Sequence, residues 1–342
     1  MHKILYLSQS DVIKNGATSM NDVINDLENQ FRVQDSGDYL LPPKIVLKWP
    51  GEHSEETVGR INAMAGYLGG NVKMAGLKWI GSGPQNPFKY NLPRASAIII
   101  LNDPITMIPI AIMDGTVISA MRTGGLTGLC CKYLAPSNSE IVALFGAGVQ
   151  CKTQIMGIMS TTPTVKRIRI YDYYQERSVA FAKDMEKRIG VEFEVVTDRA
   201  KNARDADIIV TATTATEPVL RLSDITKGCY IAHIGGMEID YDIIYKADKV
   251  VMDNWEVSKH RLGDTLSYMA SRGMIDDGRI DASVTDLVCG KKIGRENDEQ
   301  ITYTSNVGLG TYDVAVATRV YRNAQSSGLG TELVLWDDPN WL

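Results

Sequence analysis

A glycine turn between a strand-like and a helix-like segment constrains the fold of this chain more than any other feature. Residues 141–151 read IVALFGAGVQC, an apolar run that turns at Gly146 and Gly148. The first glycine allows a tight turn after a buried strand, and the second lets a phosphate approach backbone N–H groups at a helix N-terminus. The pattern predicts a strand, turn and helix that bind a dinucleotide, with Val149 also in the loop.

An acidic residue ends the next apolar run, RIRIYD. Asp172 lies about 20 residues beyond the glycine turn, the usual distance for a carboxylate that binds an adenosine ribose diol. Since a carboxylate there would repel a 2′-phosphate, NAD is favoured over NADP, although Arg177 leaves NADP open. Cys151 replaces the usual third glycine and weakens the motif, so a glycine turn without a ligand is the alternative interpretation.

Three further apolar runs follow at residues 205–216, 228–236 and 247–254, separated by polar segments of helical length. Such runs are typical of buried parallel strands in a doubly wound sheet. In that architecture ligands bind beyond the carboxyl ends of the strands. The residues expected beside the cofactor are therefore Thr211, Thr213, Thr214 and the turn from Ile234 to Met237. Alternatively, the threonines serve only as β-branched packing residues.

Composition limits the classes of partner. A chain of 342 residues is long for one core and predicts two domains. There are 36 basic and 41 acidic side chains and no basic tract, which argues against nucleic-acid or membrane-surface binding and favours small molecules. The five cysteines and four histidines lack metal-ligand spacing, so no metal is expected. Reduced thiols, the absence of a membrane-spanning run and an N-terminus unlike a signal peptide predict a cytoplasmic protein.

The first 124 residues differ from the rest in their pattern of apolar and polar residues. Residues 19–34 place Val23, Leu27 and Phe31 at a helical interval, and Ser19 or Asn21 is a candidate N-cap. The run ASAIIILND then turns and returns as IPIAIMDG, which predicts a hairpin with a buried face. An α+β domain is expected, and because exposed sheet edges of such domains often pair with a second subunit, we expect a homodimer.

Several cations of this first domain lie inside apolar segments. A cation in such a place is costly to bury without an anion, so it either extends to water or binds a carboxylate. For any single residue the solvated interpretation is favoured, but five together favour a site for a di- or tricarboxylate. These five residues are Lys44, Arg60, Lys78, Arg94 and Arg122.

The order of motifs resembles the ornithine cyclodeaminase and mu-crystallin superfamily over nearly the whole chain. The similarity lies in GLKWIGS, in NPFKYNLPRASAIIILNDPITMIPIAIMDGTVISAMRTGG, in the GAGVQ loop, in YD at 171–172 and in SNVGLGTYDVAVATRVYRNAQSSGLG. It implies an α/β fold in which a Rossmann-type NAD-binding domain, residues 125–304, is inserted in a substrate-binding and dimerisation domain, residues 1–124 and 305–342.

The resemblance also implies roles for individual residues. Lys78 matches the family lysine near the reacting carbon, and Arg122 matches the arginine that grips the substrate α-carboxylate. Lys44 matches a further carboxylate partner. For the cofactor, Thr123 matches a phosphate contact, Gln150 a pyrophosphate contact and Asn306 a residue near the nicotinamide.

One departure from the cyclodeaminase pattern bears on the reaction. Cyclodeaminases have an aspartate that handles the distal amine of the substrate, and Met237 stands at that place here. A thioether can neither bind an ammonium strongly nor accept a proton, so cyclisation loses its base. Glu238 follows directly, and a match displaced by one residue would restore that activity. Both residues are expected to contact the substrate.

Five short segments resemble one group of family members more than they resemble the cyclodeaminases. That group splits N-(2-amino-2-carboxyethyl)-L-glutamate into 2,3-diaminopropionate and 2-oxoglutarate in siderophore or antibiotic biosynthesis. The segments are residues 77–82, 94–96, 99–104, 237–238 and 294–298. The resemblance then implies NAD-dependent hydride transfer followed by imine hydrolysis, with Arg94 as the extra cation for a third carboxylate. The alternatives are a cyclodeaminase, an imine reductase, an alanine dehydrogenase or a crystallin-like nucleotide-binding protein without turnover.

Overall fold

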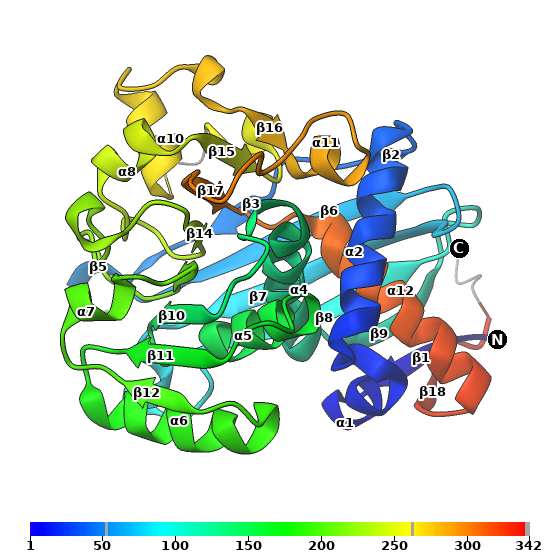
Figure 1. The fold of residues 1–342 in the computed structure, drawn as a ribbon. Helices are drawn as coiled ribbons and strands as arrows, with labels where there is room; N and C mark the ends of the chain where they lie inside the picture. Colours follow the sequence, from blue (N-terminus) through cyan, green and yellow to red (C-terminus); the bar gives the residue numbers. More distant parts are fainter. Residues whose placement is uncertain (52–53, 261–262, 339–342) are drawn as a thin grey trace. The chain divides into compact units, whose positions relative to one another are not determined.

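A computed structural model describes residues 1–51, 54–260 and 263–338. The chain divides into two compact units (Figure 1). Unit 1 comprises Met1–Arg122 and Leu309–Leu342, and unit 2 comprises Thr123–Gly308. The sequence predicted these transitions at residues 124/125 and 304/305. The α/β class with a Rossmann-type parallel sheet and a second, mixed sheet is confirmed.

Unit 1 is built on a mixed sheet of eight strands in the order β18-β1-β9-β8-β7-β6-β2, with β3 also paired to β6. Its strands are β1 His2–Leu7, β2 Tyr39–Leu40, β3 Ile45–Leu47, β6 Arg60–Leu68, β7 Met74–Ser82, β8 Ala95–Asn102, β9 Pro109–Asp114 and β18 Thr331–Trp336. A separate hairpin pairs β4 Pro50–Gly51 with β5 Ser54–Thr57. The predicted hairpin is confirmed, because β8 and β9 pair antiparallel and bury Ile99, Leu101 and Met113 on one face.

The helices of unit 1 are α1 Gln9–Val12, the π-helix η1 Ile13–Ala17, α2 Met20–Asp35, α3 Asn86–Lys89 and α12 Gly310–Ser327; α4 Thr116–Leu134 begins here. The predicted helix over residues 19–34 is confirmed, because α2 begins after Ser19 and buries Val23, Leu27 and Phe31. The long helices α2 and α12 pack on each other, and α12 also packs on β6, β7 and β8 (Figure 1). One face of the sheet is thereby covered.

Unit 2 contains a parallel sheet in the order β12-β11-β10-β13-β14-β17-β15-β16. The strands are β10 Ile141–Phe145, β11 Arg167–Tyr171, β12 Phe193–Val195, β13 Ile208–Thr211, β14 Tyr230–His233, β15 Lys249–Met252, β16 Ala282–Ser283 and β17 Thr302–Ser305. Each of the three later apolar runs contains one of these strands, as predicted. The strand order reverses between β10 and β13, where doubly wound sheets bind ligands.

The helices of unit 2, besides the rest of α4, are α5 Val149–Thr161, α6 Gln175–Ile189, α7 Arg199–Ala203, η2 Leu222–Asp224, α8 Tyr241–Lys246, α9 Trp255–Ser258, α10 Thr265–Ser271, η3 Asp277–Arg279 and α11 Val284–Val288. Its core includes Phe145 and Tyr303 from the sheet with Ile243 and Leu266 from α8 and α10. Among the helices in the described part of the chain, none is long and apolar enough to cross a membrane.

Candidate functional site

The glycine turn joins β10 to α5, and its first glycine has a backbone geometry that favours glycine. Gly146 has a φ of 103°, and a Cβ there would lie 2.7 Å from the carbonyl oxygen of Ala212. Gly148 caps α5, and a Cβ there would meet no atom within 4 Å. The next residue, Val149, is 64% exposed. The amino end of a 13-residue helix is therefore open to an anion.

Asp172 lies beside this turn, directly after β11. Its Oδ2 accepts a hydrogen bond of 2.8 Å from the N–H of Ala147, and its Oδ1 accepts one of 2.9 Å from the N–H of Tyr174. The Arg177 guanidinium stacks over the ring of Tyr174, 4.6 Å from its centroid. The carboxylate thus sits at the loop where a dinucleotide ribose diol would be bound, as its spacing in the sequence predicted.

Two amides at the carboxyl edge of the unit 2 sheet have an oxygen that no described group satisfies. Gln150 lies in the first turn of α5, and Asn306 directly follows β17. The Oε1 of Gln150 and the Oδ1 of Asn306 are buried and accept no hydrogen bond from a described residue. A buried unsatisfied acceptor costs about 1–3 kcal/mol, which a donor such as a carboxamide N–H would recover. These residues fit a nicotinamide dinucleotide.

The remaining predicted cofactor residues also belong to unit 2. Thr211 ends β13 and is buried, and the N–H of Ile234 donates to its carbonyl over 2.9 Å. Thr213 lies two residues further and accepts a hydrogen bond of 3.0 Å from the Ala215 N–H. Thr123 is half-buried on α4, beside Gly124, where a Cβ would lie 2.0 Å from the carbonyl oxygen of a residue of α5. Helix α4 thus approaches the first two turns of α5 closely beside Thr123.

Unit 1 contains a buried cluster of charged residues centred on Asp313. The Nζ of Lys78, on β7, lies 2.7 Å from the Oδ2 of Asp313, on α12. The Nε of Arg122, on α4, lies 3.1 Å from the Oδ1 of the same carboxylate. Lys78 also donates a hydrogen bond of 3.0 Å to the Oγ of Ser119. The predicted catalytic lysine and arginine are thus brought together by one aspartate.

Asp313 was not among the residues singled out from the sequence. The one local feature that could have identified it is an acidic residue within an otherwise apolar helical segment, YDVAVA. Lys78 and Arg122 were expected to meet a substrate carboxylate, but both are buried and require an anion within the protein; this fully buried carboxylate provides it.

The environment of Lys78 lowers its pKa to about 8. Burial disfavours the ammonium form most, and the positive charge of Arg122 adds to this effect; the carboxylate of Asp313 opposes it. An amine with a pKa near 8 can exchange a proton at neutral to mildly alkaline pH.

The strand register places other predicted residues on the face of the sheet that carries Lys78. Met64 of β6 is opposite Lys78, and Arg60 is four residues before Met64. Since alternate residues share a face, Arg60 lies on the same face as Lys78. Lys44, which was also predicted to bind the substrate, immediately precedes β3, and β3 pairs with β6.

Arg94 and Arg60 approach each other at the end of this sheet. Ser82 is opposite both Arg60 and Ala95, the residue after Arg94. Burial lowers the pKa of Arg94, and the charge of Arg60 lowers it further. Both side chains are nevertheless exposed, and neither guanidinium has an ion pair or hydrogen bond with a side chain that the structure describes. Two neighbouring arginines of this kind could bind an anion.

Met237 and Glu238 belong to unit 2, whereas the five cations belong to unit 1. Met237 is half-buried in the turn after β14. Glu238 is fully buried, and its carboxylate accepts hydrogen bonds from the N–H groups of Thr213 and Gly235. Both carboxylate oxygens are therefore engaged within unit 2.

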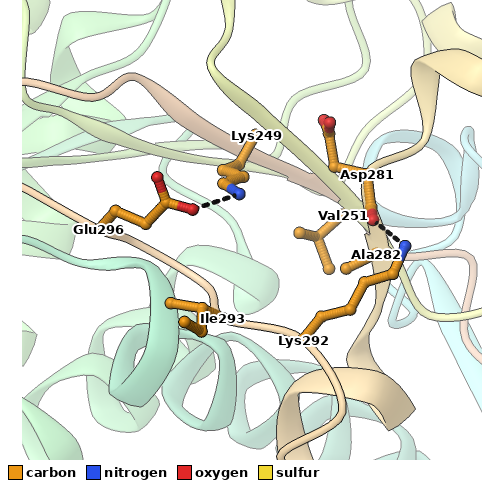
Figure 2. Close-up of a pocket in the computed structure, with 7 residues that line it drawn as sticks. All are labelled: Lys249, Val251, Asp281, Ala282, Lys292, Ile293 and Glu296. Carbon is orange, nitrogen blue, oxygen red and sulfur yellow. Dashed lines mark hydrogen bonds and ion pairs between the residues drawn. The ribbon is translucent and has the colours of Figure 1, made fainter.

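A pocket of about 270 Å³ opens at another edge of the unit 2 sheet (Figure 2). It is lined by Lys249, Val251, Asp281, Ala282, Lys292, Ile293 and Glu296. Lys249 bonds to Glu296 over 2.9 Å, and Lys292 donates to the carbonyl oxygen of Asp281. Lys249 is the first residue of β15, so the pocket includes the amino end of that strand. It contains none of the predicted site residues.

Comparison with known proteins identifies a family for this chain. The model of the ornithine cyclodeaminase/mu-crystallin family matches residues 4–328. The N-((2S)-2-amino-2-carboxyethyl)-L-glutamate dehydrogenase of Staphylococcus aureus is 30% identical, over 98% of this chain and 99% of the relative.

Two solved structures are similarly related. An archaeal alanine dehydrogenase dimer with bound NAD is 33% identical, with a TM-score of 0.88 over 98% of this chain and 100% of the relative. The Δ1-pyrroline-2-carboxylate reductase of Thermococcus litoralis, in complex with NADH and L-proline, is 34% identical, with a TM-score of 0.89 over 96% of this chain and 99% of the relative. Structural relatives with this fold thus bind NAD(H).

Proposed function

Because the chain belongs to the ornithine cyclodeaminase/mu-crystallin family, we propose that it is an NAD-dependent enzyme that oxidises an amino acid or reduces the corresponding imine. The observation that carries this proposal is the buried cluster of Lys78, Asp313 and Arg122. It combines a lysine that can exchange a proton with an arginine that can hold a carboxylate, as the reaction requires.

The residues of unit 2 that would hold the dinucleotide are those at the carboxyl edge of its sheet. The open amino end of α5 at Gly148 would hold the pyrophosphate, and Asp172 would hold the adenosine ribose. The unsatisfied Oδ1 of Asn306 would be available to a carboxamide N–H. When bound, NAD supplies the hydride chemistry, and the protein supplies orientation and charge.

Arg122 and Lys78 have different roles toward the amino acid: Arg122 binds its carboxylate, and Lys78 accepts a proton. Asp313 engages the Nε of Arg122 and leaves the terminal nitrogens of the guanidinium for a bidentate grip on the substrate α-carboxylate. Fixing that carboxylate orients the adjacent C–H bond. The Nζ of Lys78, with its pKa lowered to about 8, accepts the proton of the substrate amine or of the attacking water.

The substrate that this chain's cations favour carries more than one carboxylate. Arg60 and Arg94 lie close together without an anionic partner among the described residues, and an anionic substrate arm would satisfy both. N-(2-amino-2-carboxyethyl)-L-glutamate has three carboxylates and is the substrate named for the S. aureus relative. Oxidation of its C–N bond with reduction of NAD gives an imine, and addition of water then releases 2,3-diaminopropionate and 2-oxoglutarate.

A smaller substrate is the main alternative. The alanine dehydrogenase and pyrroline-2-carboxylate reductase relatives are as similar to this chain as the S. aureus enzyme is. Such substrates have one carboxylate and would leave Arg60 and Arg94 without a partner. Cyclodeaminase activity is less favoured, because Glu238 is fully buried in addition to accepting backbone hydrogen bonds at both oxygens, whereas Asp172, which also accepts two, is partly exposed.

The enzyme is a homodimer in this proposal, as the archaeal alanine dehydrogenase is a dimer. The face of the unit 1 sheet opposite Lys78 exposes apolar side chains on successive strands. Trp79 is 38% exposed, and its cross-strand partner Ile98 is 45% exposed. A second copy of the chain that covers this face would remove the apolar surface from water. All five cysteines lie in the described part of the chain and none forms a disulfide, which supports a reducing, cytoplasmic location.

A substrate panel tests the proposed activity. Purified protein is incubated with NAD and, separately, N-(2-amino-2-carboxyethyl)-L-glutamate, ornithine, lysine and alanine, and with NADH and Δ1-pyrroline-2-carboxylate. The absorbance of NADH reports each reaction. Turnover of the first substrate alone supports the tricarboxylate assignment, and turnover of alanine or the imine assigns the smaller substrate. Binding of NADH without turnover in any well would indicate a nucleotide-binding protein instead.

A further inference from the structure

We infer that Glu238 is a positioning residue that fastens two cofactor-binding loops of unit 2 and so sets the affinity for the dinucleotide. This inference rests on the proposed binding of NAD. The first loop follows β13 and contains Thr213, and the second follows β14 and contains Gly235. We call the pairing of Glu238 with these two loops the Glu238 clasp.

The geometry of the Glu238 clasp uses both carboxylate oxygens. Oε1 accepts the N–H of Thr213, and Oε2 accepts the N–H of Gly235 over 3.0 Å. The two strands are neighbours and parallel, so both loops leave the sheet at its carboxyl edge. That edge is where a doubly wound sheet binds its ligand. One side chain therefore fixes the spacing of two adjacent loops at the expected cofactor site.

Gly235 allows this close approach. A Cβ at that position would lie 2.1 Å from the Oε2 of Glu238. The backbone around Glu238 is also held, because its carbonyl oxygen accepts the N–H groups of Val219 and Leu220 over 2.8 and 3.1 Å. The carboxylate is thus presented from a fixed backbone to fixed donors. Its role is to hold the two loops together, not to bind a substrate amine.

Burying a carboxylate costs free energy, so an apolar residue would stabilise the fold more at this position if packing were its only role. No arginine or lysine of the described residues pairs with Glu238; the Nε2 of His233 lies 3.9 Å from its Oε2. Burial raises the pKa values of Cys151 and Tyr303, and the charge of Glu238 raises them further. Burial lowers the pKa of His233 and favours its neutral form, and the Nδ1 of this histidine bonds to the Tyr303 hydroxyl over 2.6 Å. Backbone N–H groups, not a cation, hold the Glu238 carboxylate.

Glu238→Gln is the first test variant. Its amide can accept one of the two N–H groups but presents an NH₂ group to the other, so one loop is released. We expect the dissociation constant for NADH, measured by energy transfer from protein tryptophans in the full chain, to rise about tenfold. The KM for the amino acid should stay unchanged. Glu192→Gln is the control, because this glutamate of unit 2 is exposed.

A second variant and a second measurement keep the inference testable if Glu238→Gln folds poorly. Gly235→Ala pushes a methyl group toward the same carboxylate and should weaken NADH binding similarly. Hydrogen exchange in the protein without cofactor should accelerate at residues 213 and 235 in both variants but not in Glu192→Gln. This exchange does not depend on turnover or on NAD.

Three outcomes separate the possibilities. Unchanged NADH affinity together with unchanged exchange in both variants would overturn the Glu238 clasp. A raised KM for the amino acid with unchanged NADH affinity would also overturn it, because Glu238 would then act on the substrate. Failure of the wild-type protein to bind NADH would contradict the proposed function, whereas the exchange data would still decide whether Glu238 holds the loops.

Discussion

The Nζ of Lys78 lies 2.7 Å from the Oδ2 of Asp313, and both side chains are buried. These residues are 235 positions apart in the sequence, on a strand and on the helix that packs against it. Because Asp313 also binds Arg122, one carboxylate fixes both the proposed proton acceptor and the proposed carboxylate anchor. Its removal should therefore affect the fold and the chemistry together.

Asp313→Asn tests this relationship. The change leaves two buried cations without an anion, so we expect a loss of about 3–5 kcal/mol in the free energy of unfolding, measured with denaturant. We also expect kcat/KM to fall on the order of 100-fold as Lys78 and Arg122 lose their positions. Asp337→Asn is the matched control, because Asp337 is exposed in the same unit. Equal effects of both variants would refute the role of Asp313.

The pH dependence of oxidation should report Lys78. Its pKa is lowered to about 8, and only the neutral amine accepts a proton, so kcat/KM should rise with pH and level off above about pH 8. Lys78→Met should reduce kcat by roughly 10²–10⁴-fold and remove this step from the profile. An unchanged profile in the variant would assign the titration to another group.

The paired arginines should determine which substrates are accepted. Arg94→Met removes half of the expected anion site, so the KM for the tricarboxylate should rise roughly 10–100-fold, as for loss of a hydrogen bond to a charged group. The KM for NAD should not change. Arg167→Met, an exposed change in unit 2, is the control. If Arg94→Met instead leaves the KM unaltered, a substrate with one carboxylate is indicated.

Asp172 should control the choice between NAD and NADP. Asp172→Ser removes the carboxylate that accepts the Ala147 N–H and that we propose binds the ribose, so kcat/KM with NAD should fall about tenfold or more. The loss with NADP should be smaller, because the 2′-phosphate no longer meets a negative charge. Steady-state rates with both cofactors give the comparison. A proportional loss with both would mean that Asp172 only holds the loop.

Much of the fold could be predicted from local patterns. Strands β10, β13, β14 and β15 are almost fully buried on both faces and read as apolar runs, while Gly146 marked the end of β10 and Asp172 the end of β11. Residues 19–34 showed a helical interval for the same reason: one face of α2 is buried.

One missed residue, and several relationships between residues that were singled out, depend on contacts between distant parts of the chain. Asp313 looked like an ordinary acid because its two cations lie far away in the sequence. Glu238 was expected at the substrate, and only the positions of the β13 and β14 loops show that its carboxylate is already engaged. The pairing of Arg60 with Arg94 likewise follows from strand register, which the sequence did not specify.

Dimer formation can be tested at the exposed apolar face of unit 1. Trp79→Arg places a charge where a second copy is expected to pack, so the protein should become monomeric in light-scattering measurements while its NADH affinity is kept. Tyr245→Arg changes an exposed aromatic residue of unit 2 and is the control. A dimer that survives Trp79→Arg would place the interface elsewhere.

The most direct test of the proposed reaction is to identify its products. With N-(2-amino-2-carboxyethyl)-L-glutamate and NAD, we expect NADH, 2,3-diaminopropionate and 2-oxoglutarate in equal amounts, measured by absorbance and mass spectrometry. The Asp313→Asn protein should form all three far more slowly. Absence of these products from wild-type protein that turns over alanine or Δ1-pyrroline-2-carboxylate would contradict the tricarboxylate assignment.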